Sequence, residues 1–168
     1  MRYLLLFLIV LGSCKSQKKP LIAKEAKTEQ LCPEDGDCTF EILKNKNLVL
    51  NYQSLGNFYP MFPEGENIIV KFEYKRNEMS NTQDSSYREE ILIQLDPNNL
   101  ELETTNLKEK KMLFARWCYC KGETGYYKIK YGNLLVKKIK ENLYELNLSF
   151  KIDEVPQVIT KIQHIFSL

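Results

Sequence analysis

Histidine is nearly absent from this 168-residue sequence, which contains only His164. A Ser-His-Asp triad and a histidine metal cluster both need histidine, so a single one near the chain end gives little support to either. The seven glycines are scattered, without the spacing of a P-loop or a G-x-G-x-x-G turn, and no G-x-S-x-G occurs. We therefore predict a protein without a catalytic site, a cofactor or a resident metal.

An excess of charge of either sign is also lacking, with 24 Lys and Arg against 22 Asp and Glu. Residues 15–31 contain five Lys and two Glu, whereas residues 32–168 contain 18 basic and 20 acidic side chains. A main part without a basic excess argues against nucleic-acid binding. No internal repeat or low-complexity segment occurs, so residues 32–168 are predicted to form one globular domain.

The one long apolar run lies at the N-terminus, where Arg2 and Tyr3 precede eight apolar residues, 4–11. This order is typical of a secretory signal, and the run is too short to span a bilayer as a helix. Residues 11–14, LGSC, follow directly and resemble the bacterial lipobox. The resemblance implies diacylglyceryl attachment to the sulfur of Cys14, cleavage after Ser13 and acylation of the new amine.

The lipobox divides the chain into three parts: a helical signal peptide (residues 1–13), a lipidated flexible tether (14–31) and a β-rich domain (32–168). Several acyl chains on Cys14 would anchor the protein stably to a membrane. Residues 15–19, KSQKK, lack the acidic pair that acts as a surface-export signal in some lipoproteins of the Bacteroidota. We therefore predict a cell-envelope protein anchored in the outer membrane and facing the periplasm.

Alternation of apolar and polar residues dominates the predicted domain and indicates antiparallel strands. The clearest cases are residues 68–74 and 144–152. Gly132-Asn133 and Glu141-Asn142 are typical of two-residue hairpin turns, and together they predict a three-strand meander over residues 126–152. Shorter predicted strands cover residues 39–43, 48–52, 87–95, 100–103, 112–120, 126–131 and 134–140.

Two segments depart from this alternation. Residues 106–111 are predicted to form a short helix capped by Asn106. After Pro156, apolar residues recur at helical spacing as far as Phe166. This predicts a C-terminal helix packed on the sheet, with a last strand as the alternative. The predicted fold is therefore mainly β, an antiparallel β-sandwich or a curved, barrel-like meander with a short C-terminal helix.

Four cysteines remain once Cys14 is assigned to lipid, and an even number in an exported chain predicts two disulfides. In one scheme, Cys32 and Cys38 each bond to Cys118 or to Cys120 and staple the two segments together. In the other, Cys32 bonds to Cys38 across a Pro/Asp/Gly turn. Cys118 and Cys120 then form a dithiol or a strained disulfide, which is a candidate redox or metal site. A four-thiolate zinc site is disfavoured, because the gaps of five and one residues differ from the usual spacing.

Aromatic residues give the best indication of a binding surface. Residues 58–63, FYPMFP, are apolar, and five more aromatic residues gather late in the chain. Exposed aromatics would form a platform for a sugar, a peptide or a partner protein, whereas the more ordinary interpretation is that most of them complete the core. The candidate surface comprises Phe58, Tyr59, Phe62, Trp117, Tyr119, Tyr126, Tyr127 and Tyr131.

Charged residues on predicted strands give weaker indications. Glu89 and Glu90 would supply paired carboxylates, but adjacent strand residues point to opposite faces, so we interpret them as surface charge. Arg116 lies between Phe114 and Cys118 on an apolar strand face. It would need a carboxylate or a water molecule if it were buried.

These features predict a non-enzymatic envelope lipoprotein. We expect it to be a binding or structural module that is stapled by disulfides and that contacts another envelope protein, a peptide or a glycan. The whole chain resembles small lipoproteins of the Bacteroidota in the segments LGSCKSQKK, CPEDGDCTFEILKNK and MLFARWCYCKGETGYYKI. That resemblance brings no activity with it. The alternatives are a periplasmic thiol redox protein using Cys118 and Cys120, and a glycan or peptide binder using the aromatic residues.

Overall fold

The computed structural model describes residues 32–54, 56–78, 80, 82 and 84–168. The predicted signal peptide, Cys14 and the tether lie outside the described residues. Strands dominate the described part, which confirms the predicted mainly β fold. No helix among the described residues has the length and hydropathy that crossing a bilayer requires.

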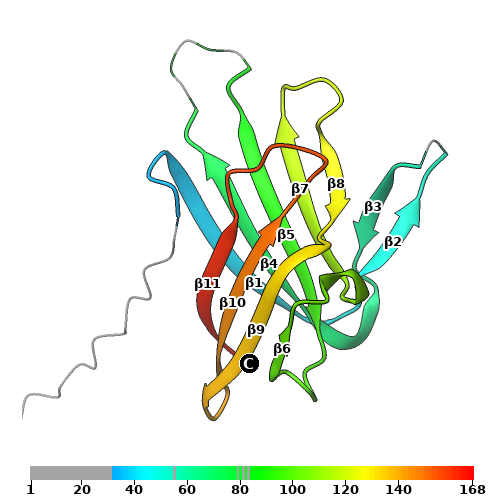
Figure 1. Cartoon of the computed structure of the whole chain (residues 1–168), viewed down its shortest axis with the longest axis vertical. Helices are drawn as coiled ribbons and strands as arrows, with labels where there is room; N and C mark the ends of the chain where they lie inside the picture. Colours follow the sequence, from blue (N-terminus) through cyan, green and yellow to red (C-terminus); the bar gives the residue numbers. More distant parts are fainter. Residues whose placement is uncertain (1–31, 55, 79, 81, 83) are drawn as a thin grey trace, which may run out of the picture.

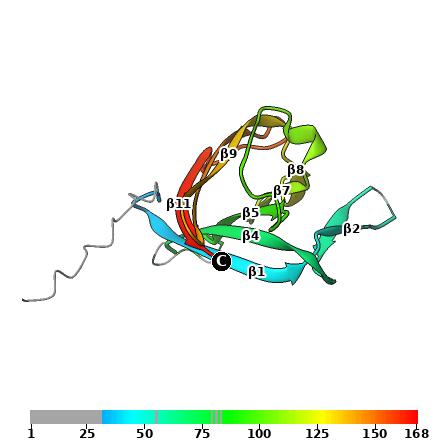
Figure 2. The ribbon, with the colours of Figure 1, turned by 90° about the horizontal axis from the view of Figure 1, so that it is seen from below.

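Two antiparallel sheets pack face to face, without closing into a barrel (Figure 1). The larger sheet contains, in spatial order, β1 (Gly36–Lys46), β4 (Glu64–Arg76), β5 (Tyr87–Leu95), β7 (Met112–Cys118) and β8 (Gly125–Lys128). The smaller sheet contains, in spatial order, β11 (Lys161–Ser167), β10 (Leu143–Lys151), β9 (Tyr131–Lys140) and β6 (Leu102–Thr104). A separate hairpin of β2 (Val49–Tyr52) and β3 (Phe58–Met61) projects from one side of the molecule (Figure 2).

The main core fills the space between the two sheets. The predicted alternation at residues 68–74 is confirmed, since Val70, Phe72 and Tyr74 of β4 all point into this core. Leu146 and Leu148 of β10 meet them from the smaller sheet. Burial of these alternating side chains removes them from water and fixes which face of each strand turns inward.

A second, smaller core lies on the opposite face of the larger sheet. Ile69, Leu92 and Leu113 are at most 2% exposed there, and Leu50 and Phe58 of the β2–β3 hairpin cover them. The middle of β5 is consequently buried on both faces. This second core holds the hairpin against the sheet, and β3 lies close to β8.

The predicted C-terminal helix is wrong, because residues 161–167 form β11, which pairs with β10. The alternative of a last strand is correct. Ile162 and Phe166 are buried, and their spacing of four residues fits one face of a strand as well as one face of a helix. The predicted helix over residues 106–111 shortens to a 3-10 turn, η1 (Leu107–Glu109).

The predicted meander over residues 126–152 is also wrong, since β8 pairs with β7 in one sheet and β9 pairs with β10 in the other. Only residues 129 and 130 separate β8 from β9, so the chain crosses between the sheets at that point. Gly132 and Asn133 lie within β9 and are not a turn. The second predicted turn, Glu141-Asn142, does join β9 to β10.

Candidate functional site

Five of the eight predicted aromatic residues line one groove of about 510 Å³ between the β2–β3 hairpin and the end of β7 and β8. We call it the aromatic groove. Its aromatic residues come from β3 and from the consecutive strands β7 and β8, which the fold brings together although β3 lies far from them in the sequence. They are Phe58, Tyr59, Trp117, Tyr126 and Tyr127. The side chains of Phe58 and Tyr126 also pack against the smaller core, and the side chain of Tyr127 packs against the main core on the opposite face of β8.

Trp117 occupies the wall of the aromatic groove. Its ring meets the ring of Tyr126 edge-on, with the centroids 5.3 Å apart. The guanidinium carbon of Arg88 lies 5.5 Å from the Trp117 ring centroid. The indole Nε1 of Trp117 is buried and has no hydrogen-bond partner among the described residues. Contacts with Tyr126 and Arg88 therefore hold Trp117 in place.

The polar part of the aromatic groove consists of amides and a hydroxyl. Gln53 and Asn57 come from the loop between β2 and β3, and Thr124 precedes β8. None of the lining residues is charged, although 27% of the whole sequence is. The groove therefore offers flat apolar surfaces together with neutral donors and acceptors.

The other three predicted aromatic residues lie elsewhere. Phe62 packs against the smaller core under the hairpin. Tyr119 is 80% exposed in the loop after β7, and Tyr131 of β9 lies next to the ammonium of Lys108, at 5.2 Å from the ring centroid. The eight predicted residues therefore do not form one surface. Four of them, Phe58, Phe62, Tyr126 and Tyr127, pack against one of the two cores, as the core interpretation expects.

The cysteines form two local disulfides, Cys32–Cys38 and Cys118–Cys120, with Cα atoms 5.8 and 5.2 Å apart. These pairs match the second predicted scheme. They do not match the first scheme, in which disulfides would join Cys32 and Cys38 to Cys118 and Cys120. An extended strand would place the Cα atoms of Cys118 and Cys120 roughly 6.6 Å apart. They come closer because β7 ends at Cys118 and the backbone then turns.

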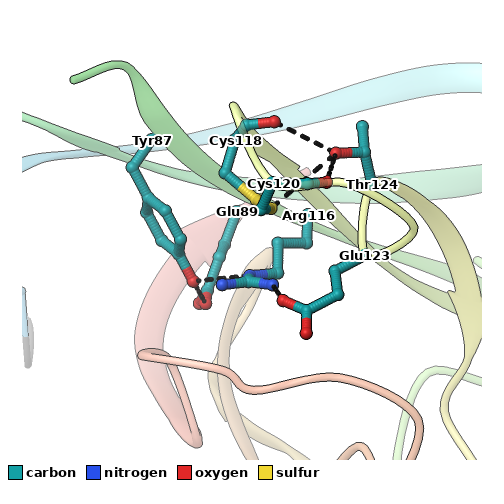
Figure 3. Close-up of a disulfide and its surroundings, with 7 residues drawn as sticks. All are labelled: Tyr87, Glu89, Arg116, Cys118, Cys120, Glu123 and Thr124. Carbon is teal, nitrogen blue, oxygen red and sulfur yellow. Dashed lines mark hydrogen bonds and ion pairs between the residues drawn. A yellow bond between two sulfur atoms is a disulfide. The ribbon is translucent and has the colours of Figure 1, made fainter. Parts of the chain in front are cut away.

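Figure 3 shows the surroundings of the second disulfide. The Thr124 hydroxyl lies 3.1 Å from the carbonyl oxygen of Cys118 and donates to it. Arg116 forms an ion pair with Glu123 of the same loop, which is the carboxylate partner that its apolar strand position required. Thr124 also lines the aromatic groove, so the disulfide loop and the groove share a residue.

A buried polar network lies beside this loop (Figure 3). Glu89 is fully buried, and its carboxylate accepts hydrogen bonds from the Tyr87 hydroxyl at 2.5 Å and from the backbone N–H groups of Val158 and Ile159 at 2.6 and 2.7 Å. Arg116 Nε donates to the Tyr87 hydroxyl at 3.3 Å. Burial, followed by the hydrogen bond to Glu89, raises the pKa of Tyr87 to about 12.

The interpretation of Glu89 and Glu90 as surface charge is therefore wrong, because both are buried. Glu90 lies 3.4 Å from the Lys71 ammonium and accepts a hydrogen bond from Tyr126 at 3.3 Å. Burial and the neighbouring Glu90 raise the pKa of Tyr126. The two carboxylates face opposite sides of β5, as strand geometry requires, and each is satisfied within its own layer.

Other groups with potential chemistry are dispersed. His164 stacks on Phe40 with ring centroids 3.8 Å apart, and burial lowers its pKa. Across the described part of the chain, no three His, Cys, Asp or Glu side chains gather in a way that could hold a metal ion. The aromatic groove and the disulfide loop beside it are the best-formed candidate site.

The fold and this site define a two-layer antiparallel β-sandwich with an uncharged aromatic groove at the edge of its larger sheet. Comparison of the chain with protein-family models, with curated proteins and with solved structures gave no match.

Proposed function

We propose that this protein is a non-enzymatic binding module of the bacterial cell envelope, and that its aromatic groove binds a neutral glycan. The lining of the groove carries this proposal. It combines aromatic residues, among them Tyr59 and Trp117, with amides and a hydroxyl and contains no charged residue. Its volume of about 510 Å³ is that of a small-ligand site.

A neutral glycan matches this lining better than the other partners considered, a peptide or an envelope protein. Aromatic faces pack against the apolar C–H faces of sugar rings, while amides and hydroxyls exchange hydrogen bonds with sugar hydroxyls. A peptide carries charged side chains or termini, which gain nothing from an uncharged groove. A flat protein interface would leave the concave groove unfilled.

Trp117, the only tryptophan of the chain, provides a direct test because it lines the groove. We expect neutral oligosaccharides to change its fluorescence in a saturable way, with Kd values in the micromolar to millimolar range. Tyr59→Ala removes a stacking surface worth about 1 kcal/mol and should weaken binding about fivefold. Tyr131→Ala is the matched control, because Tyr131 is also exposed but lies outside the groove.

Two outcomes of this titration would contradict the proposal. In one, no neutral oligosaccharide alters the Trp117 fluorescence. In the other, Tyr59→Ala and Tyr131→Ala weaken binding equally, which would place the binding surface outside the groove.

The location of the module rests on the sequence. We propose that lipid on Cys14 anchors it in the outer membrane, with residues 15–31 as a tether and the domain facing the periplasm. The basic tether would lie favourably beside anionic headgroups. Incorporation of labelled palmitate into the wild-type chain, and its loss in Cys14→Ser, tests the anchor.

Thiol redox chemistry at Cys118 and Cys120 is a second candidate function, favoured by their pairing with each other in the structure. A thiolate of a partner dithiol would attack one sulfur, form a mixed disulfide and release the other cysteine as a thiolate. The second partner thiolate would then displace the first cysteine. Two electrons and two protons would pass from the partner dithiol to the Cys118–Cys120 pair.

The redox function predicts that dithiothreitol reduces Cys118–Cys120 at a lower concentration than Cys32–Cys38. Cys118–Cys120 closes a loop whose single intervening residue is the exposed Tyr119, and only Cys118 of this pair packs against the main core, whereas Cys32 and Cys38 both do. Short, exposed disulfides are the more easily reduced ones. Alkylation followed by peptide mapping measures both. Reduction of Cys32–Cys38 first, or of both together, would contradict a redox role.

A further inference from the structure

A second pocket, of about 340 Å³, lies between β2, η1, the start of β7 and the end of β8. It shares no lining residue with the aromatic groove. Its rim carries four lysines, so we call it the basic pocket. The lysines are Lys108, Lys110, Lys111 and Lys128.

The floor of the basic pocket is aliphatic. Leu48 and Leu113 of the smaller core are each 2% exposed, and Leu50 is half-buried beside them, while Met112 turns its side chain to the main core. No aromatic ring belongs to the lining. Nucleobases are usually bound by stacking on aromatic side chains, so this floor favours an alkyl chain over a base.

The rim is strongly positive. Glu109 is the only carboxylate of the lining, which leaves a formal charge of +3 on a domain whose 18 basic and 20 acidic side chains nearly cancel. None of the four lysines lies within ion-pair distance of a carboxylate of the described residues. Uncompensated charge of one sign around a concave surface attracts an ion of the opposite sign.

We propose that the basic pocket binds a single-chain anionic amphiphile, with its alkyl chain on the aliphatic floor and its carboxylate or phosphate head among the lysines. Charge complementarity selects this occupant. The chain's own tether is a poor alternative, because residues 15–31 carry five Lys against two Glu and would be repelled.

Calorimetric titration of the full chain carrying Cys14→Ser, which removes the predicted lipidation site, tests the proposal. The probe is dodecyl phosphate below its micelle concentration. We expect it to bind at least tenfold more tightly than dodecyl maltoside, which has the same chain and a neutral head. Inorganic phosphate, which has the head without the chain, should show no binding at the same concentrations.

Paired lysine variants locate the site. Lys110→Gln with Lys111→Gln should weaken dodecyl phosphate binding about tenfold, since each lost charge contact to the head is worth up to about a factor of five. Lys138→Gln with Lys140→Gln makes the same change in total charge on exposed positions of β9, outside the pocket, and should leave binding unchanged. Val49→Asp, at the exposed edge of the floor, should weaken binding as well.

Three results would overturn the proposal. The first is equal affinity for dodecyl phosphate and dodecyl maltoside, and the second is equal loss in both lysine pairs. The third is binding to phosphatidylglycerol vesicles without binding to monomeric dodecyl phosphate, which would identify a membrane surface as the source of the anion. Trp117 lies outside this pocket, so the result of the glycan titration is independent of the result with dodecyl phosphate.

Discussion

Glu89→Ala is expected to lower the free energy of unfolding by about 3–5 kcal/mol, one of the largest effects of any substitution in the domain. The carboxylate is fully buried and accepts hydrogen bonds from the Tyr87 hydroxyl and from the backbone N–H groups of Val158 and Ile159. Alanine would leave these three donors without an acceptor in a dry interior. The segment before β11 would lose its attachment to β5.

Urea unfolding at neutral pH measures this effect. Glu89→Gln keeps the shape of the side chain but retains one acceptor oxygen, and we expect a smaller loss of about 1–2 kcal/mol. Glu41→Ala on β1 is the matched control, because Glu41 is exposed, and its effect should stay within about 0.5 kcal/mol. A loss of less than about 1 kcal/mol for Glu89→Ala would show that water or rearranged backbone satisfies the three donors.

Glu89 also supports the candidate site. Its partner Tyr87 accepts a hydrogen bond from Arg116, and Arg116 pairs with Glu123 in the loop that carries the second disulfide. Thr124 follows directly and lines the aromatic groove. A continuous chain of contacts therefore connects the buried centre of β5 with the groove, and the position of the loop depends on a residue that a ligand would never touch.

The sequence predicts the strands well where one face is buried and the other is exposed. Residues 87–95 were predicted with the same bounds as β5, and residues 68–74 and 144–152 fall within or almost within β4 and β10. The C-terminal helix failed for a physical reason. Apolar residues four positions apart share one face of a helix and also one face of a strand. The segment forms a strand because it pairs with the edge of β10, which the spacing alone does not reveal.

The candidate site is less predictable because it depends on contacts between distant segments. The aromatic residues could be listed from the sequence, but only the small core under the β2–β3 hairpin brings Phe58 and Tyr59 to β8. Glu89 looked like surface charge because its backbone partners are 69 and 70 residues away. The lysines at 108, 110 and 111 did form a visible cluster in the sequence. Their aliphatic floor, however, comes from β2, the residue before it and β7.

Gly132→Ala is the second substitution with a large expected effect, about 3–5 kcal/mol of unfolding free energy. Gly132 lies where the chain enters the smaller sheet after crossing from β8, and its φ of 143° is accessible to glycine almost alone. A Cβ atom built there would lie 2.0 Å from the carbonyl oxygen of Ser149 on β10. Since that neighbour is backbone, the clash can be relieved only by moving the paired strand.

Gly125→Ala separates the two causes of this loss. Gly125 has a similar φ of 137°, but nothing lies within 4 Å of the position of its Cβ atom. Its substitution should cost about 1–2 kcal/mol from backbone strain alone. The remaining difference, about 2 kcal/mol or more, measures the close approach of β9 to β10. Equal losses in urea unfolding would mean that the backbone conformation, and not this approach, requires glycine where the chain passes from one sheet to the other.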